Sequence, residues 1–256
     1  MPFQYVSVED AIARDGLRMV VVGNVPSPWG EASKGILHIK RIRWVAVRLV
    51  YDSEALNNWS GQRNAPVAVY NDERPRPGWN EILLLAERLA PTPALLPKDP
   101  SDRALVFGLG HEMLGEEGLA WSRRLQLIHV GLENAGGFPQ RIARYLARKY
   151  GHSAASGAAS ASRVAELLRM LAARLKAQRA AGSRYYVGQA LTAADIYSAT
   201  VTALFVPLPA EHCAMDAGMR AAFETRDAET DAALDPIVIE HRDMMYAQHL
   251  ELPLSL

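Results

Sequence analysis

The sequence contains a single cysteine, Cys213, among 256 residues. One thiol per chain excludes an intrachain disulfide, a redox site built on a cysteine pair and a cysteine-rich metal site. It also fits a reducing compartment, so we expect a cytoplasmic protein. No apolar run reaches the roughly 18 residues that a membrane-spanning helix needs, and the chain does not start with a basic segment followed by an apolar one. We therefore expect no membrane partner.

The sequence has no net charge either, because 28 Lys and Arg residues balance 28 Asp and Glu residues. A chain without a basic excess has no overall attraction for nucleic acid, so we expect no nucleic-acid partner. Hydrophobic residues make up 49% of the sequence and charged residues 22%. This composition allows a packed core and excludes global disorder, and the length allows one large domain or two ordinary ones.

Residues 17–40 have the pattern of a strand, a turn and a helix. The run from Leu17 to Gly23 is apolar and ends in glycine, which is typical of a buried strand. Pro26 ends the strand, and Pro28 suits the first turn of a helix, where its missing N–H costs nothing. Ser27 therefore lies at a predicted helix start, where unpaired backbone N–H groups can hold an anion or a thiolate.

The rest of the first ninety or so residues alternates between strands and helices. We predict a short helix after Ser7, strands over 43–50 and 65–70, a loop over 51–64, an edge strand or loop over 73–78, and a helix over 79–89. Pro66 starts its strand and can be cis, as at tight turns. Because strand, helix and strand follow one another over 17–50, these two strands are predicted to be parallel.

Prolines interrupt residues 91–100, which we interpret as a linker between two domains. Beyond the linker the pattern is helical, with helices predicted over 101–114, 119–132, 139–150, 160–180, 192–206, 215–224 and 236–249. Residues 151–161 consist mainly of Ser, Ala and Gly and are interpreted as a flexible connector. The organisation is therefore an α/β domain followed by an all-α domain.

Three motifs, in this order, resemble those of the glutathione S-transferase superfamily. They are Ser27-Pro28-Trp29 followed by Lys34, Ala65-Pro66-Val67, and Gly188 followed by Leu191-Thr192-Ala193-Ala194-Asp195-Ile196. The resemblance implies a thioredoxin-like, glutathione-binding domain with a small mixed sheet over residues 1–90, including a short N-terminal extension. It further implies that 91–100 is the linker and that 101–256 is a helical-bundle domain.

The resemblance also implies roles for individual residues. Ser27 is the expected catalytic residue, and the backbone around Ala65 and Pro66 is expected to pair with the cysteinyl part of glutathione. Trp29 is expected either in the wall of a cosubstrate pocket or in the packing between the domains. Thr192 and Asp195 form a capping motif, because an acidic residue three places after Thr can bond the free N–H groups of the helix start.

One position departs from the family pattern. The family has a Glu/Gln-Ser pair at the start of the helix that precedes the linker, where it holds the γ-glutamyl carboxylate of glutathione. Gly78 and Trp79 occupy these two places here. The free N–H groups of that helix start, with Arg74 or Arg76 nearby, are then the expected anchor.

Glutathione is therefore the expected substrate, without a metal. The His111-Glu112 pair begins like a zinc-protease helix, but Gly115 stands where the second His ligand belongs. We expect a homodimeric enzyme that adds the glutathione thiolate to a small electrophile. The alternative is a protein of the same fold that serves in binding or assembly without catalysis, in which case Ser27 only caps a helix.

A further pattern lies in the helix predicted over 139–150. Arg141, Arg144, Arg148 and Lys149 make up a basic face, and Ile142, Tyr145 and Leu146 lie opposite. We interpret the basic face as solvated and the apolar face as core.

Overall fold

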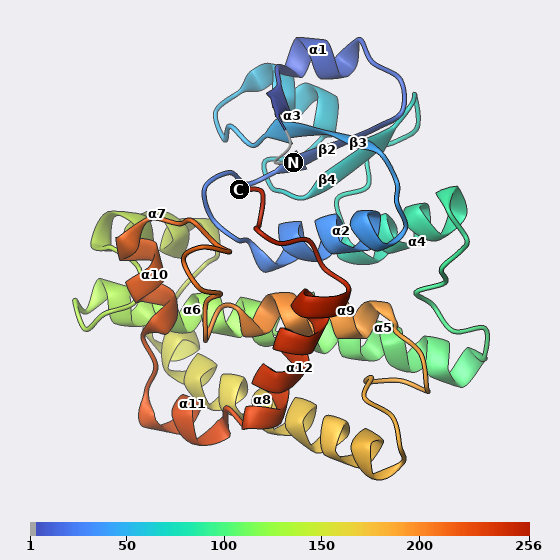
Figure 1. Ribbon diagram of the computed structural model, residues 1–256. Helices are drawn as coiled ribbons and strands as arrows, with labels where there is room; N and C mark the ends of the chain where they lie inside the picture. Colours follow the sequence, from blue (N-terminus) through green and yellow to red (C-terminus); the bar gives the residue numbers. More distant parts are fainter. Residues whose placement is uncertain (1–3) are drawn as a thin grey trace.

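The computed structural model describes residues 4–256 as a small sheet followed by packed helices (Figure 1). The strands are β1 (Tyr5–Val6), β2 (Leu17–Val21), β3 (Trp44–Arg48) and β4 (Val67–Tyr70). The helices are α1 (Val8–Ile12), α2 (Pro28–Ile39), α3 (Glu54–Ser60), α4 (Trp79–Leu89), α5 (Pro100–Leu114), α6 (Leu119–Leu132), α7 (Gln140–Lys149), α8 (Ala154–Ala180), α9 (Ala193–Thr202), α10 (Ala217–Glu224), α11 (Ala228–Ala233) and α12 (Pro236–Gln248). Within residues 4–256 no helix is both long and apolar enough to cross a bilayer.

The sheet has the strand order β1-β3-β2-β4. Strands β1 and β2 are parallel to β3, whereas β4 is antiparallel to β2. The predicted parallel unit of β2, α2 and β3 is therefore confirmed, and so is the small mixed sheet. Strand β1 was not predicted, because two residues are too few to show an alternation of apolar and polar side chains. The segment 73–78 pairs with β4 through an isolated bridge between Ala68 and Arg76.

Both faces of the sheet are covered, and the alternation along β2 explains how (Figure 1). Leu17, Met19 and Val21 belong to the large core that continues into α2, α4 and the C-terminal helices. Val20 faces the other way, into a small core with Ala11 of α1 and Leu56 of α3. Since successive strand residues point to opposite faces, one apolar strand serves both cores. Helices α2 and α4 thus lie between the sheet and the C-terminal helices, next to the domain boundary.

The prediction of a loop over 51–64 is wrong, because α3 lies within it. Ser53 accepts a hydrogen bond from the N–H of Leu56 at 3.2 Å, and Gly61 ends the helix in the left-handed conformation with φ 65°. The Ser and Gly residues that favoured a loop are therefore the two caps of a short helix.

The predicted flexible connector over 151–161 is also wrong, because α8 begins at Ala154. The Ser153 hydroxyl accepts a hydrogen bond from the N–H of Ser156 at 3.1 Å and caps the helix. Alanine has the highest helix propensity, and Gly157 has a packing role: a Cβ there would lie 2.5 Å from Nδ1 of His129. The small residues that indicated flexibility form a close contact between α8 and α6 instead.

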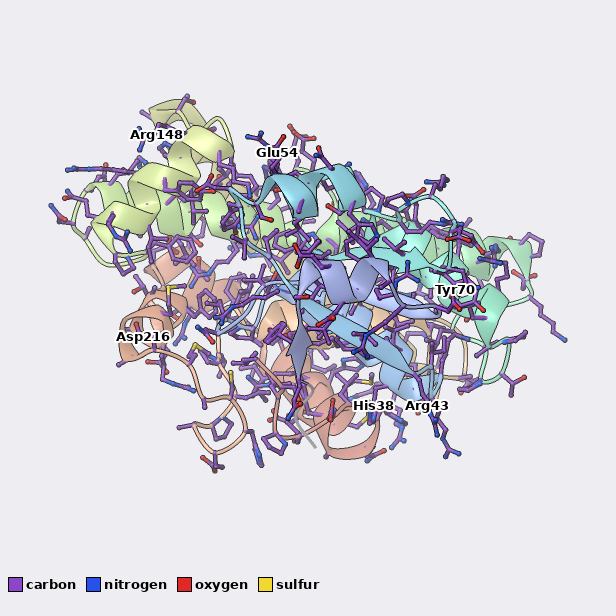
Figure 2. The ribbon with its side chains drawn as sticks, turned by 90° about the horizontal axis from the view of Figure 1, so that it is seen from above. His38, Arg43, Glu54, Tyr70, Arg148 and Asp216 are labelled. Atoms are coloured by element: carbon purple, nitrogen blue, oxygen red, sulfur yellow. The ribbon has the colours of Figure 1, made fainter. Side chains whose placement is uncertain are left out.

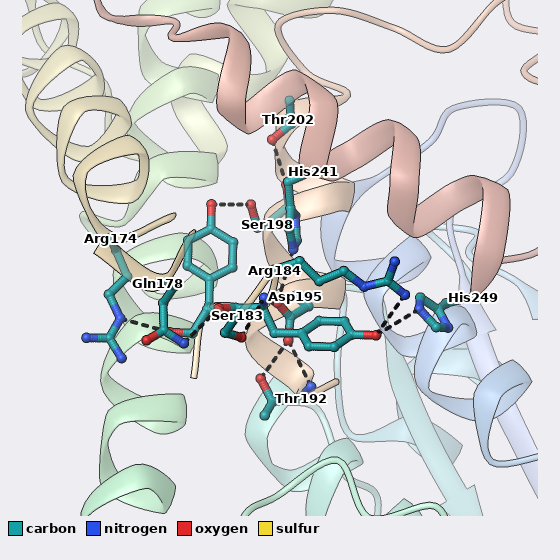
Figure 3. A network of polar contacts seen from close by, with 12 residues as sticks. Arg174, Gln178, Ser183, Arg184, Thr192, Asp195, Ser198, Thr202, His241 and His249 are labelled. Atoms are coloured by element: carbon teal, nitrogen blue, oxygen red, sulfur yellow. Dashed lines mark hydrogen bonds and ion pairs between the residues drawn. The ribbon is translucent and has the colours of Figure 1, made fainter. Parts of the chain in front are cut away.

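Helix α9 is the centre of the helical domain, and every one of its residues is buried. At its start the carboxylate of Asp195 accepts hydrogen bonds from the N–H of Tyr186 at 2.8 Å and from the N–H and hydroxyl of Thr192 at 2.8 and 2.9 Å. Nε2 of His241, from α12, lies 3.1 Å from the same carboxylate (Figure 3). Asp195 thus joins the start of α9 to the preceding loop and to α12.

Candidate active site

A cavity of about 450 Å³ lies between the thioredoxin-like domain and the helical domain. Its volume is within the range of small-molecule sites, roughly 300–1,000 Å³. From the sheet side it is lined by six of the residues predicted to form the site, namely Ser27, Trp29, Ala65, Pro66, Gly78 and Trp79. From the other side it is lined by residues of α6, α7 and the end of α5. The fold therefore brings together three segments that are distant in the sequence.

Ser27 is the N-cap of α2, with Pro28 as the first helical residue. Its side chain makes no capping hydrogen bond to the helix, although serine in this position commonly does. The hydroxyl is half-buried at the cavity wall. It can therefore donate a hydrogen bond to a group in the cavity, beside the N–H groups of the first helical turn, which have no acceptor within the helix.

Ala65 and Pro66 lie directly before β4. They line the same cavity as Ser27. The peptide bond between them is cis, the isomer that the sequence suggested. Pro66 is buried, whereas Ala65 is half-buried. This leaves the backbone before β4 at the cavity wall, where it can pair with an extended peptide ligand.

Gly78 is the N-cap of α4 and Trp79 its first residue, and both line the cavity. The N-cap Gly78 has no side chain to cap this helix, and Oδ1 of Asn80 accepts the N–H of Glu81 at 2.9 Å. The N–H groups of Trp79 and Asn80 are therefore the ones that a carboxylate can meet. The ring of Trp79 packs edge-on against Tyr197 of α9, with ring centroids 5.3 Å apart. Trp79 thus supplies interdomain packing at a position where the family pattern has a hydroxyl.

Gly110 of α5 makes room for the Trp79 ring. A Cβ at Gly110 would lie 2.6 Å from that ring and 3.1 Å from Tyr197. We predict that Gly110→Ala lowers the free energy of unfolding by about 1–3 kcal/mol, because overpacking forces a rigid ring to move. The midpoint of urea unfolding measures the change.

Gly108→Ala is the matched control for this prediction. It lies on the same helix, is exposed, and a Cβ there would meet nothing within 4 Å. Replacing an exposed helical glycine by alanine stabilises by about 0.5–1 kcal/mol. Equal effects of the two substitutions would contradict the proposed role of Gly110.

Arg74 and Arg76, the expected cationic anchors, both form ion pairs with carboxylates. Arg76 lies 2.6 Å from Glu73, and Arg74 lies 2.5 Å from Glu81. Hydrogen bonds from Arg88 and Arg76 hold the pKa of Glu73 below its usual range, so this carboxylate stays charged. Neither arginine lines the cavity. The N–H groups at the start of α4 are therefore the nearer anchor.

Trp29 packs between the two domains and also lines the cavity; its role toward a cosubstrate stays a prediction. Its Nε1 donates a hydrogen bond of 2.6 Å to the carbonyl of Leu114, at the end of α5 in the helical domain. Its ring also lines the cavity and lies under the guanidinium of Arg124, 4.2 Å from Cζ to the ring centroid. Lys34, by contrast, is turned away from the cavity: it pairs with Glu31 at 2.5 Å and donates to the carbonyl of Ser255.

Sequence reasoning missed several polar side chains of the cavity wall, among them Tyr51, Arg124, Lys149 and Tyr150. Arg124 lies over the ring of Tyr150 at 4.5 Å, and Nζ of Lys149 lies 4.2 Å from the ring centroid of Tyr51. Burial and the neighbouring Arg124 lower the pKa of Lys149 to about 8. Arg124 and Lys149 bring two positive charges to the helical side of the cavity, which the exposed Glu116 also lines.

The His111-Glu112 pair takes no part in a metal site. Glu112 is paired with Arg163 at 2.6 Å, and His111 is exposed. Within residues 4–256, no group of three or more His, Cys, Asp or Glu side chains is placed to hold a metal ion.

No protein-family model matches this sequence, and no curated protein has a similar sequence. The structure, however, is similar to those of glutathione S-transferases. One from Methylobacterium radiotolerans, in complex with glutathione sulfonate, has a TM-score of 0.63 and 20% identity, with 91% of each chain covered. One from Xanthobacter autotrophicus has a TM-score of 0.59 and 18% identity, with 93% of this chain and 96% of that chain covered.

A third similar structure is a glutathione S-transferase domain-containing protein from Marinobacter aquaeolei. It has a TM-score of 0.63 and 15% identity, with 90% of this chain and 98% of that chain covered. The similarity thus extends over both domains and confirms the predicted fold class. The chain has the glutathione S-transferase fold, with a thioredoxin-like domain followed by a helical domain.

Proposed function

We propose that this protein is a glutathione transferase that joins the glutathione thiolate to a small electrophile. The observation that carries the proposal is the placement of Ser27: an uncommitted hydroxyl at a helix N-terminus, on the wall of a cavity that the cis Ala65–Pro66 segment also lines. The similar protein from Methylobacterium radiotolerans binds glutathione sulfonate, which supports glutathione as the ligand here.

Ser27 would act on the protonation of the thiol. A free cysteine thiol titrates near pH ~8.5, so only a few per cent is thiolate at neutral pH. A hydrogen bond from the Ser27 hydroxyl and the N–H groups of the α2 start stabilise the charged sulfur, and each pKa unit corresponds to about 1.4 kcal/mol. The thiol releases its proton to solvent, and the sulfur then forms a bond to the electrophilic carbon while the leaving group departs with its electron pair.

The rest of glutathione would lie along the sheet edge. The cysteinyl backbone pairs with the chain before Pro66, and the γ-glutamyl carboxylate meets the N–H groups at the start of α4. Because Gly78 and Trp79 provide no hydroxyl there, backbone donors alone hold that carboxylate.

By the same resemblance we propose a cytoplasmic homodimer whose partner is a small-molecule electrophile.

A second candidate function is binding or assembly without catalysis. The observation that favours it is the Gly78-Trp79 pair, which replaces a carboxylate-binding side chain by a packing residue. The two functions differ in turnover. We expect the wild-type protein to conjugate glutathione with chlorodinitrobenzene, measured by the absorbance of the product. Glutathione binding without turnover of this or other aryl halides would favour the second function.

A further inference from the structure

Two cations of the helical domain face the cavity without an acidic partner. The guanidinium of Arg124, on α6, is enclosed by the rings of Trp29 and Tyr150. Nζ of Lys149, at the end of α7, lies over the ring of Tyr51 and 5.6 Å from that of Tyr150, and it donates a hydrogen bond of 3.5 Å to the carbonyl of Arg63. Aromatic faces attract cations, but they do not neutralise them.

Other arginines of the described chain form ion pairs with carboxylates. Arg163, Arg74 and Arg76 each lie within 2.6 Å of a carboxylate oxygen. Across residues 4–256 neither Arg124 nor Lys149 has such an ion pair, and Glu116, the acidic side chain found on the described cavity wall, is exposed and pairs with neither. The cavity therefore holds two half-buried positive charges whose counter-ion is not part of the described chain.

Two half-buried positive charges without a counter-ion are energetically unfavourable, because burial removes part of their solvation. Burial lowers the pKa of the Arg124 guanidinium, and burial together with the charge of Arg124 lowers that of Lys149. An anion between them relieves both effects, because it restores the solvation that the charges lost. The planar fork of arginine matches the two oxygens of a carboxylate.

We propose that Arg124 and Lys149 bind a carboxylate of the electrophilic cosubstrate, whose aromatic body lies against Trp29 and Trp121, two indole rings that line the cavity. This inference rests on the proposed function, since the cosubstrate shares the cavity with glutathione. The sheet domain provides the contacts proposed for glutathione, at Ala65, Pro66 and the start of α4. The two cations belong to α6 and α7, which line the helical side of the same cavity.

A matched pair of electrophiles tests the inference: chlorodinitrobenzoate, with its carboxylate para to the chlorine, and the corresponding chlorodinitrobenzamide. Thiolate attack displaces chloride from both compounds, but only the benzoate carries a negative charge, on its carboxylate. We expect kcat/KM to favour the benzoate by about 10-fold or more, the effect of a charge-assisted hydrogen bond. Lys149→Gln should reduce this preference several-fold, and so should Arg124→Gln if that more buried variant folds.

Arg148→Gln is the control, because Arg148 is the neighbouring residue on α7 (labelled in Figure 2) but is exposed and does not line the cavity. It removes the same charge from the same helix and should leave the preference unchanged. An equal loss in both variants would indicate long-range attraction to a basic helix and would overturn the inference.

The preference should also depend on pH. Lys149 faces Arg124 from α6, Tyr51 from the segment before α3, and Tyr150 next to it, so its proton is lost as the pH rises through about 8. The benzoate-to-benzamide ratio of kcat/KM should fall over this range in the wild type, because kcat/KM reports the free enzyme. The ratio cancels the titration of the thiol, and Lys149→Gln should remove the pH dependence.

Calorimetry with unreactive dinitrobenzoate and dinitrobenzamide, in saturating glutathione, separates this inference from the proposed function. Tighter binding of the benzoate without any turnover of the chlorinated pair supports the inference and contradicts the proposed function. Turnover of both electrophiles without a preference supports the function and overturns the inference. A raised KM for glutathione in Lys149→Gln with an unchanged ratio means that the cations hold a carboxylate of glutathione, and it also overturns the inference.

Discussion

Asp195→Asn is expected to lower the free energy of unfolding by about 3–5 kcal/mol. Asp195 is fully buried, and its two oxygens accept hydrogen bonds from Tyr186 and Thr192 and meet His241. An asparagine of the same shape offers one acceptor oxygen, and its NH₂ group would face an N–H donor. A buried donor without an acceptor carries the full cost of desolvation. The melting temperature should fall by roughly 10 °C.

Asp99→Asn provides the control for this prediction. Asp99 caps α5 by accepting hydrogen bonds from the N–H groups of Ser101 and Asp102, but it is exposed. Asparagine and aspartate are about equally good N-caps, so the change should stay within about 0.5 kcal/mol. Chemical denaturation of both variants measures the difference. If Asp195→Asn is as mild as the control, the network of Figure 3 does not hold α9 in place.

Ser27→Ala is expected to raise the pKa of the bound glutathione thiol by one to two units, which corresponds to the roughly 1.5–3 kcal/mol of a hydrogen bond to a charged group. At neutral pH kcat/KM should then fall about 10-fold to 100-fold. The variant should stay folded, because the hydroxyl makes no capping bond that stabilises α2. The ultraviolet absorbance of the thiolate, followed against pH in the complex, measures the pKa directly.

Ser33→Ala is the control on the same helix. The Ser33 hydroxyl donates to the carbonyl of Trp29 at 2.9 Å and does not line the cavity. Its loss should leave the thiol pKa unchanged. If Ser27→Ala keeps the wild-type pKa and activity while glutathione still binds, the fold is right but another group activates the thiol.

The sequence predicts part of the site because proline, glycine and serine mark the starts of strands and helices. Ser27, Pro66 and Gly78 each stand where a strand or helix begins, and Pro and Gly mark such places strongly. Their meeting in one cavity follows from the order of elements in a small mixed sheet, because the turn after β2 and the turn before β4 lie at the same edge. The roles of these residues toward glutathione stay predictions.

Sequence patterns within a single segment do not predict the cavity wall that α6 and α7 form. The sequence pattern places Lys149 on a solvated face with Arg141, Arg144 and Arg148, but in the structure it lines the cavity together with Ile142, Leu146 and Tyr150. These four positions have the spacing of one helix face, so a closer count would have placed Lys149 on the apolar side. Its contact with Tyr51 and the contact of Arg124 with Trp29 join the two domains, and no pattern within one helix predicts them.

Calorimetric titration with glutathione shows whether the cavity binds glutathione as a thiolate. We expect one site per chain that is occupied at millimolar glutathione or below, with release of a proton because the thiol ionises on binding. The observed heat should therefore vary with the ionisation enthalpy of the buffer. S-methylglutathione, which has no thiol proton, should bind without this buffer dependence. Absence of binding at millimolar glutathione, or binding with no proton release around neutral pH, would contradict the account.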